Sequence, residues 1–124
     1  MQTAAVASEE KKQILVVEDE ALIAMDLQRQ LQRLGYDVPA IAHSGEQALQ
    51  RARSSVFDLV LMDIHLPGEL DGVRTAEILW NEFQTPVVYT TAHSDPETLK
   101  RAELSGSLAY LLKPISSDTL RTTV

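Results

Sequence analysis

Three short apolar runs in the chain each end in a charged residue. Residues 14–17 precede Glu18 and Asp19, residues 59–62 precede Asp63, and residues 108–112 precede Lys113. Short apolar runs with β-branched and aromatic residues, bounded by charge, are typical of strands buried on both faces of a parallel sheet. Ligands of such sheets gather beyond the carboxyl ends of the strands. If these strands are neighbours, three carboxylates and one ammonium surround a single crevice, which favours a divalent cation and a phosphoryl group.

Strand-like and helix-like patterns alternate from Gln13 onward. The pattern predicts strands near 13–17, 38–42, 58–62 and 86–90, a fifth strand ending at Lys113, helices over about 20–34, 44–53 and 73–83, and two more helices that begin near Asp95 and Ser117. Pro39 has no N–H to donate, so we expect its strand at the edge of the sheet. The alternation predicts a doubly wound α/β domain, because right-handed crossovers place helices on both faces.

The 124 residues are enough for one compact domain and too few for two ordinary ones. Residues 1–12 have no sustained hydrophobic period, and we interpret them as a flexible tail or linker in front of a domain over 13–124. The last predicted helix has room for only about two turns. We therefore expect the chain to be a domain excised from a longer protein, with its fifth helix truncated.

Charge and composition exclude several classes of function. A net charge of -7 disfavours direct nucleic-acid binding, which needs clustered lysine and arginine. No segment approaches the roughly 20 apolar residues of a membrane span, so we expect no membrane association. The sequence has no cysteine, which fits a reducing compartment, and we expect a cytoplasmic protein.

The clustered acids indicate metal and phosphoryl chemistry. Three carboxylates at one sheet edge repel one another, and carboxylate oxygens favour a hard cation such as magnesium, Mg²⁺. Asp63 stands alone at the end of its strand, between the other groups, which makes it the best candidate nucleophile for forming an acyl phosphate. Thr91 and Lys113, at the ends of the fourth and fifth strands, are available to bind the phosphoryl oxygens.

Over residues 13–124 these motifs resemble the receiver domain of two-component response regulators and hybrid histidine kinases. The resemblance is carried by Glu18-Asp19, by Asp63 within MDIHLPGELDG, by Thr91-Ala92, by Tyr110 and by Lys113-Pro114. It implies a flavodoxin-like five-stranded parallel sheet of order 2-1-3-4-5. It also implies that Glu18, Asp19 and Asp63 bind Mg²⁺ with the backbone carbonyl of His65. Asp63 would accept phosphate from a histidine, and Thr91 and Lys113 would bind the phosphoryl group.

The same resemblance implies a switch and a set of partners. Thr91 would move toward the phosphate, and Tyr110 would turn inward to fill the space that it leaves. His65 and His93 occupy positions that tune the lifetime of the phosphate in the family. The partners implied are a histidine kinase or histidine phosphotransfer domain, a second receiver, and an output domain or protein that reads the surface of the fourth helix, fifth strand and fifth helix.

Two other functions remain open on the sequence alone. A Mg²⁺-dependent phosphohydrolase could use the same aspartyl phosphate, although hydrolases of the haloacid dehalogenase type place an acid where this chain has His65. A receiver-like module could bind partners without phosphorylation, although all the expected acidic, hydroxyl and lysine positions are filled. We expect a signalling domain that phosphorylates and dephosphorylates itself, and not a turnover enzyme.

Overall fold

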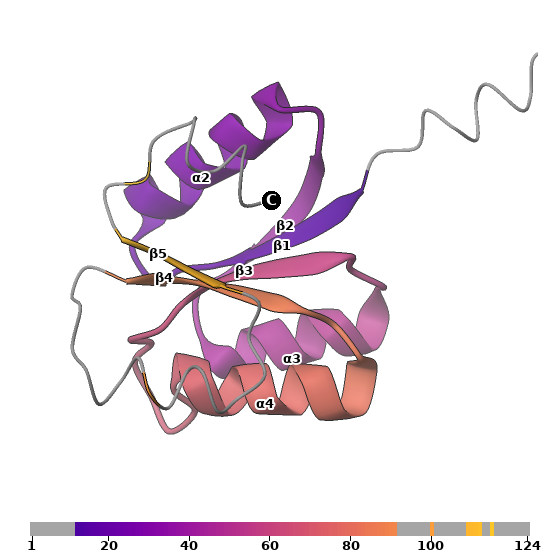
Figure 1. Cartoon of the computed structure of the whole chain (residues 1–124), viewed down its shortest axis with the longest axis vertical. Helices are drawn as coiled ribbons and strands as arrows, with labels where there is room; N and C mark the ends of the chain where they lie inside the picture. The colour runs from indigo at the N-terminus through magenta and orange to yellow at the C-terminus, as the bar shows by residue number, and fades with distance from the viewer. Residues whose placement is uncertain (1–11, 92–99, 101–108, 113–114, 116–124) are drawn as a thin grey trace, which may run out of the picture.

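A five-stranded parallel sheet forms the centre of the computed structural model, which describes residues 12–91, 100, 109–112 and 115 (Figure 1). The strands are β1 (Gln13–Val17), β2 (Asp37–Ala42), β3 (Leu59–Asp63), β4 (Val87–Thr91) and β5 (Ala109–Leu112). Their order across the sheet is β2-β1-β3-β4-β5, and all four neighbouring pairs are parallel. The predicted fold class and strand order are therefore confirmed.

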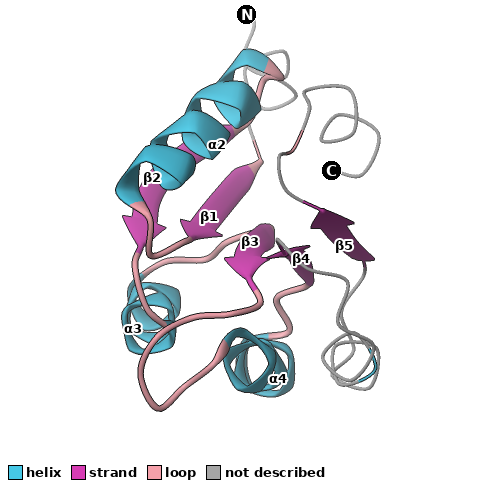
Figure 2. Ribbon diagram, turned by 90° about the vertical axis from the view of Figure 1, so that its left-hand side faces the viewer, coloured by secondary structure: helices cyan, strands magenta, loops and turns pink. Residues whose placement is uncertain are grey.

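Helices cover both faces of the sheet, as expected for a doubly wound domain. Helix α2 (Ala21–Arg33) lies on one face, whereas α3 (Gly45–Ser54) and α4 (Gly72–Phe83) lie side by side on the other (Figure 2). The helices predicted to begin near Asp95 and Ser117 lie outside the described residues. Among the helices that are described, none is long and apolar enough to cross a membrane.

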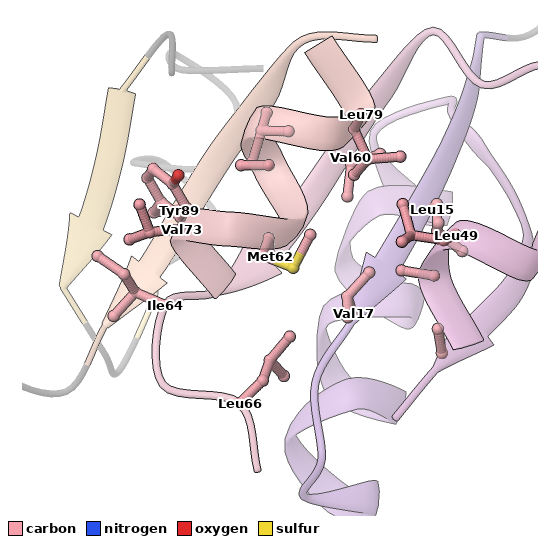
Figure 3. Packing of buried hydrophobic residues seen from close by; sticks show 14 of the residues in the cluster. Leu15, Val17, Leu49, Val60, Met62, Ile64, Leu66, Val73, Leu79 and Tyr89 are labelled. Carbon is pink, nitrogen blue, oxygen red and sulfur yellow. The ribbon is translucent and has the colours of Figure 1, made fainter. Parts of the chain in front are cut away.

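Alternation along the strands divides the buried side chains into two clusters. Leu15, Val60 and Tyr89 belong to the cluster under α3 and α4, which also contains Val73 (Figure 3). The residues next to them in sequence, such as Ile14 and Leu61, belong to the cluster under α2. Successive side chains of a strand point to opposite faces, so a strand that is apolar at every position can contribute to both clusters.

Local sequence signals account for the ends of the helices. Ser44 caps α3, because its Oγ accepts a hydrogen bond of 3.1 Å from the backbone N–H of Gln47. After α2, Gly35 adopts a φ of +100°, a left-handed conformation that favours glycine. Both ends agree with the predicted helices over about 20–34 and 44–53.

Strand β2 lies at the edge of the sheet, where Pro39 predicted it. The pairing of β1 with β2 shifts register between Gln13 and Leu15, which pair with Asp37 and Ala40. Two residues of β1 therefore span three of β2, and Pro39 lies within the irregular stretch. A proline is tolerated at such a position because the regular ladder is already interrupted there.

Candidate functional site

Three carboxylates meet at the carboxyl edge of the sheet. The ligand oxygens of Glu18, Asp19 and Asp63 all lie within 4.8 Å of one another. Parallel register brings them together, because Val17 pairs with Met62 and the acids are the next residues on the two chains. Glu18 is fully buried and Asp63 is 6% exposed, whereas Asp19 faces solvent. The structure thus assembles the acid cluster that the sequence predicted.

This cluster has the chemistry of a site for a hard divalent cation. At 4.8 Å and an effective dielectric near 20, the buried pair of Glu18 and Asp63 repels by about 3 kcal/mol, and solvent weakens the repulsion from exposed Asp19. A cation placed among the carboxylate oxygens would offset this electrostatic repulsion. Three carboxylates fit Mg²⁺, which prefers oxygen ligands and keeps several waters.

Asp63 is held in place by the backbone around it. It is the last residue of β3 and pairs with Thr90 of β4. One of its carboxylate oxygens accepts a hydrogen bond of 2.9 Å from the backbone N–H of His65, and the N–H of Ile64 donates to the carbonyl of Thr90. The chain therefore turns sharply after Asp63 while the carboxylate stays at the sheet edge.

Gly72 closes the loop that follows Asp63. Its backbone N–H donates to the carbonyl of Ile64 at 3.3 Å, and a Cβ at this position would overlap the carbonyl oxygen of Asp63 and lie 2.8 Å from the Cα of Ile64. Asp71 caps α4, since its side chain accepts a hydrogen bond of 2.8 Å from the N–H of Arg74. The absence of a side chain at Gly72 allows α4 to begin directly against the strand end that carries Asp63.

Two threonines end β4, and their side chains face opposite sides of the sheet. Thr91 is fully buried and follows Tyr89 by two residues, so it faces the α3 and α4 layer. Thr90 follows Val88 by two residues and faces the α2 layer beside its partner Asp63. The buried Thr90 hydroxyl has no hydrogen-bond partner within the described part of the chain. The predicted phosphoryl ligand Thr91 thus ends the strand beside the one that carries Asp63.

The remaining predicted site residues are only partly described. Tyr110 belongs to β5, where its backbone pairs with Tyr89, and Leu112 pairs with Thr91. Lys113 and His93 lie outside the described residues. His65 is exposed, and its backbone N–H contacts Asp63.

The structure also argues against a purely structural role for the acids after β1. An acidic run before an apolar helix could simply cap that helix through its dipole. Instead α2 begins at Ala21, its first turn contains no acid, and its N-cap Glu20 makes no side-chain cap. Glu18 turns into the carboxylate cluster, and one of its carboxylate oxygens accepts a hydrogen bond of 3.1 Å from the N–H of Glu20.

Sequence reasoning missed two residues that shape this edge. Neither Gly72 nor His43 is among the predicted site residues. In the structure the His43 ring contacts the backbone of Glu18 at 2.9 Å. The pair Asp71-Gly72 was an available signal for a helix cap, whereas no sequence signal marks a contact between residues 25 positions apart.

Comparison with known protein families gives a single consistent result. Residues 14–124 match the family model described as the response regulator receiver domain. Among curated proteins, the transcriptional regulatory protein PdtaR of Mycobacterium tuberculosis is 38% identical over 109 residues, which cover 88% of this chain and 53% of PdtaR. The transcriptional regulatory protein ZraR of Escherichia coli is 44% identical over 112 residues, which cover 90% of this chain and 25% of ZraR.

Solved structures agree with the sequence relatives. The signal receiver domain of a modulated diguanylate cyclase from Desulfovibrio desulfuricans superposes with a TM-score of 0.87 and 39% identity, covering 92% of this chain and 90% of that one. The chain spans about half the length of PdtaR and a quarter of ZraR. The similarity therefore concerns one domain of these relatives.

Proposed function

The chain belongs to the family of response regulator receiver domains, and from that premise we propose that Asp63 is its phosphoacceptor. The observation that carries the proposal is the convergence of Glu18, Asp19 and Asp63 within 4.8 Å. Asp63 is the member that is both nearly buried and located at a strand end, with Thr91 ending the adjacent strand. A carboxylate held in this way can attack an incoming phosphorus from a fixed position.

The reaction transfers a phosphoryl group from a phosphohistidine of a histidine kinase or histidine phosphotransfer domain. An oxygen of Asp63 attacks phosphorus, so a P–O bond forms while the P–N bond breaks and the departing imidazole takes up a proton. The hydrogen bond from the His65 N–H to Asp63 orients the carboxylate for this attack. The product is an aspartyl phosphate, and in this proposal the domain keeps it as a signal until it dephosphorylates itself, instead of turning over a substrate.

Glu18, Asp19 and Asp63 would hold Mg²⁺, together with the backbone carbonyl of His65. When bound, Mg²⁺ supplies positive charge that offsets the repulsion among the carboxylates and the incoming phosphoryl oxygens. Thr91 donates its hydroxyl to the phosphoryl group, and Lys113, the residue after the end of β5, pairs with its negative charge. His65 follows the acceptor by two residues and His93 follows Thr91 by two residues, and the proposal gives both a role in tuning the lifetime of the aspartyl phosphate.

Phosphorylation is proposed to change the conformation of one surface of the domain. Phosphorylation adds a charge of about -1.5 to -2, which draws Thr91 toward the phosphate. Tyr110, whose strand pairs with β4, then turns toward the space that Thr91 leaves. The surface formed by β5 and the helices predicted near Asp95 and Ser117 would carry this change to an output domain, a partner protein or a second receiver.

The proposed organisation is a linker over 1–12 and a receiver over 13–124. The curated relatives are longer than this chain, which supports an output region elsewhere in the protein or in a partner. Cytoplasmic localisation is part of the proposal and fits a sequence without cysteine. The net charge of -7 disfavours a direct output to nucleic acid through this domain, so any such output would come from another one.

Phosphorylation by a small donor tests the assignment. Purified protein is incubated with Mg²⁺ and phosphoramidate, whose P–N bond mimics phosphohistidine, and the intact mass is measured. We expect wild type and the control Asp58→Asn to gain one phosphoryl group, and Asp63→Asn to gain none. Incorporation that survives Asp63→Asn would overturn the assignment of the acceptor.

The same samples distinguish the alternatives. Multiple turnover on p-nitrophenyl phosphate would favour a phosphohydrolase. Failure of wild type to gain a phosphoryl group from phosphoramidate or acetyl phosphate, with Mg²⁺ binding intact, would favour a module that binds partners without phosphorylation.

A further inference from the structure

The loop that carries Glu18 and Asp19 is fixed by contacts from β2 and from the loop before α3. The backbone N–H of Glu18 donates to the carbonyl of Ala42 at 2.9 Å, which extends the pairing of β1 with β2 by one residue. Beyond that bond the ladder ends. The next contact from the same side is made by a side chain, His43, whose Nδ1 lies 2.9 Å from the carbonyl oxygen of Glu18.

We propose that His43 is a positioning residue for the metal-binding acids, acting through the peptide that joins Glu18 to Asp19. A carbonyl oxygen only accepts hydrogen bonds, so Nδ1 carries the proton and donates. The carbonyl of Glu18 and the N–H of Asp19 belong to one rigid plane. Holding that carbonyl therefore limits the directions in which both side chains leave the backbone. This inference rests on the proposed role of the two acids as metal ligands.

The two acids depend on this peptide to different degrees. Glu18 is fully buried and has the N–H of Glu20 as a further contact. Asp19 is exposed, so packing constrains its side chain less. Because the three carboxylates repel one another, the exposed one would swing outward most easily. A fixed peptide opposes that movement and keeps the oxygen of Asp19 within reach of the other two.

His43 is itself held by the first turn of α3. Its backbone N–H donates to the side-chain Oε1 of Gln47 at 2.8 Å, and the Gln47 N–H donates to the capping hydroxyl of Ser44. A chain of hydrogen bonds thus runs from the helix start through His43 to Glu18. These bonds restrain the His43 backbone and thereby limit where its ring can lie.

Packing does not explain why the imidazole is there. His43 is exposed and lines an open groove of about 540 Å³ together with Ile41, Gln47, Gln50, Arg51 and Ser54. Replacing the ring therefore leaves no cavity in either buried cluster. A variant at this position should remain folded, so any effect on the acids can be attributed to the lost hydrogen bond.

The test compares four variants by calorimetric titration with Mg²⁺. His43→Leu removes the donor, and His43→Asn retains a side-chain N–H near the position of Nδ1. Gln47→Leu leaves the ring but removes its support, and Gln50→Leu is the control in the same groove. One hydrogen bond predicts about 2- to 10-fold weaker Mg²⁺ binding in His43→Leu, with a smaller loss in Gln47→Leu. Binding by His43→Asn and Gln50→Leu should stay within twofold of wild type.

A second measurement uses the metal-free proteins. The backbone amide of Asp19 shares the peptide that His43 holds, so its NMR chemical shift should change in His43→Leu and return toward wild type in His43→Asn. Equal Mg²⁺ affinity in His43→Leu and wild type, or equal losses in His43→Leu and His43→Asn, would overturn the positioning role. If wild type itself binds no Mg²⁺, the metal-binding part of the proposed function fails instead.

Discussion

The two ends of the sheet both carry acids, yet they use them in opposite ways. At the amino end, Asp58 accepts a hydrogen bond of 2.7 Å from the backbone N–H of Gln13, and Asp37 accepts one of 2.8 Å from the Gln13 side chain. At the carboxyl end, Glu18, Asp19 and Asp63 crowd within 4.8 Å, and Glu18 and Asp63 are buried. Acids at one end tie strands together, whereas acids at the other end are forced close despite their repulsion.

This difference separates a structural carboxylate from a functional one more clearly than residue type does. A carboxylate with its own donor stabilises the fold, and its removal costs stability. Glu18 and Asp63 also accept backbone hydrogen bonds, but each lies next to other carboxylates. Replacing Asp63 with asparagine keeps an acceptor oxygen and removes the repulsion, so it should stabilise the fold while destroying the site. The sign of the stability change therefore distinguishes the two ends.

The largest expected effect is at Asp63. Asp63→Asn should lose phosphorylation by phosphoramidate completely, because an amide nitrogen and oxygen are poor nucleophiles for phosphorus. In metal-free buffer the same variant should be more stable than wild type by about 2 kcal/mol, since one charge of the buried pair is gone. Urea unfolding monitored by circular dichroism measures this. A destabilised Asp63→Asn would contradict the comparison between the two ends.

Metal binding should offset the repulsion among the carboxylates at the carboxyl end and so stabilise the fold. At a Mg²⁺ concentration 100 times the dissociation constant, wild type should gain about 2.7 kcal/mol in free energy of unfolding. Asp63→Asn should gain much less, whereas Asp58→Ala should gain as much as wild type. Thermal unfolding with and without Mg²⁺ checks both, and equal gains in wild type and Asp63→Asn would show that the cluster is not the binding site.

The backbone of the carboxyl end is tested at Gly72. Gly72→Ala places a methyl group against the carbonyl of Asp63 and the Cα of Ile64, so backbone must move. We expect a loss of about 2 kcal/mol in stability and slower phosphorylation, since overpacking shifts the acceptor. Gly35→Ala is a useful control, because it meets no atom within 4 Å and only its φ of +100° is strained. Similar phosphorylation rates in Gly72→Ala and wild type would contradict this reasoning.

The smallest effect is expected at the amino end. Asp58→Ala removes the acceptor of the Gln13 N–H and should cost about 1 kcal/mol. Its Mg²⁺ affinity and phosphorylation should match wild type, because the two ends of β3 are separated by the length of the strand. Urea unfolding and the phosphoramidate assay measure the two properties on the same sample. A weakened Mg²⁺ site in Asp58→Ala would mean that the two ends are coupled.

Much of the fold followed from local patterns. Continuous apolar runs predicted strands buried on both faces, Pro39 predicted the edge strand, and Ser44 predicted the start of α3. Strand ends differed by one residue, since β3 and β4 extend to Asp63 and Thr91 where the prediction stopped at Met62 and Thr90. Pairing with the adjacent strand decides whether a polar residue ends a strand or follows it, and a single sequence does not contain that pairing.

The acid cluster could also be predicted, because parallel strands bring their carboxyl ends to one edge. The contacts that hold the cluster in place could not be predicted. The close approach of Gly72 to Asp63 and the bond from His43 to Glu18 join residues that are distant in sequence. Such contacts depend on how loops and helix starts meet in space, which hydrophobic periodicity does not encode.

The interrupted register of β2 bears on the behaviour of the protein in concentrated solution. An edge strand with a regular row of free N–H and C=O groups can recruit a strand from another molecule and begin aggregation. Here Pro39 offers no N–H, and the register shift against β1 disturbs the regular spacing along the same strand. A foreign strand that approaches β2 would find an incomplete template. This edge of the sheet is thus protected against fibril-like growth by one residue and the irregularity around it.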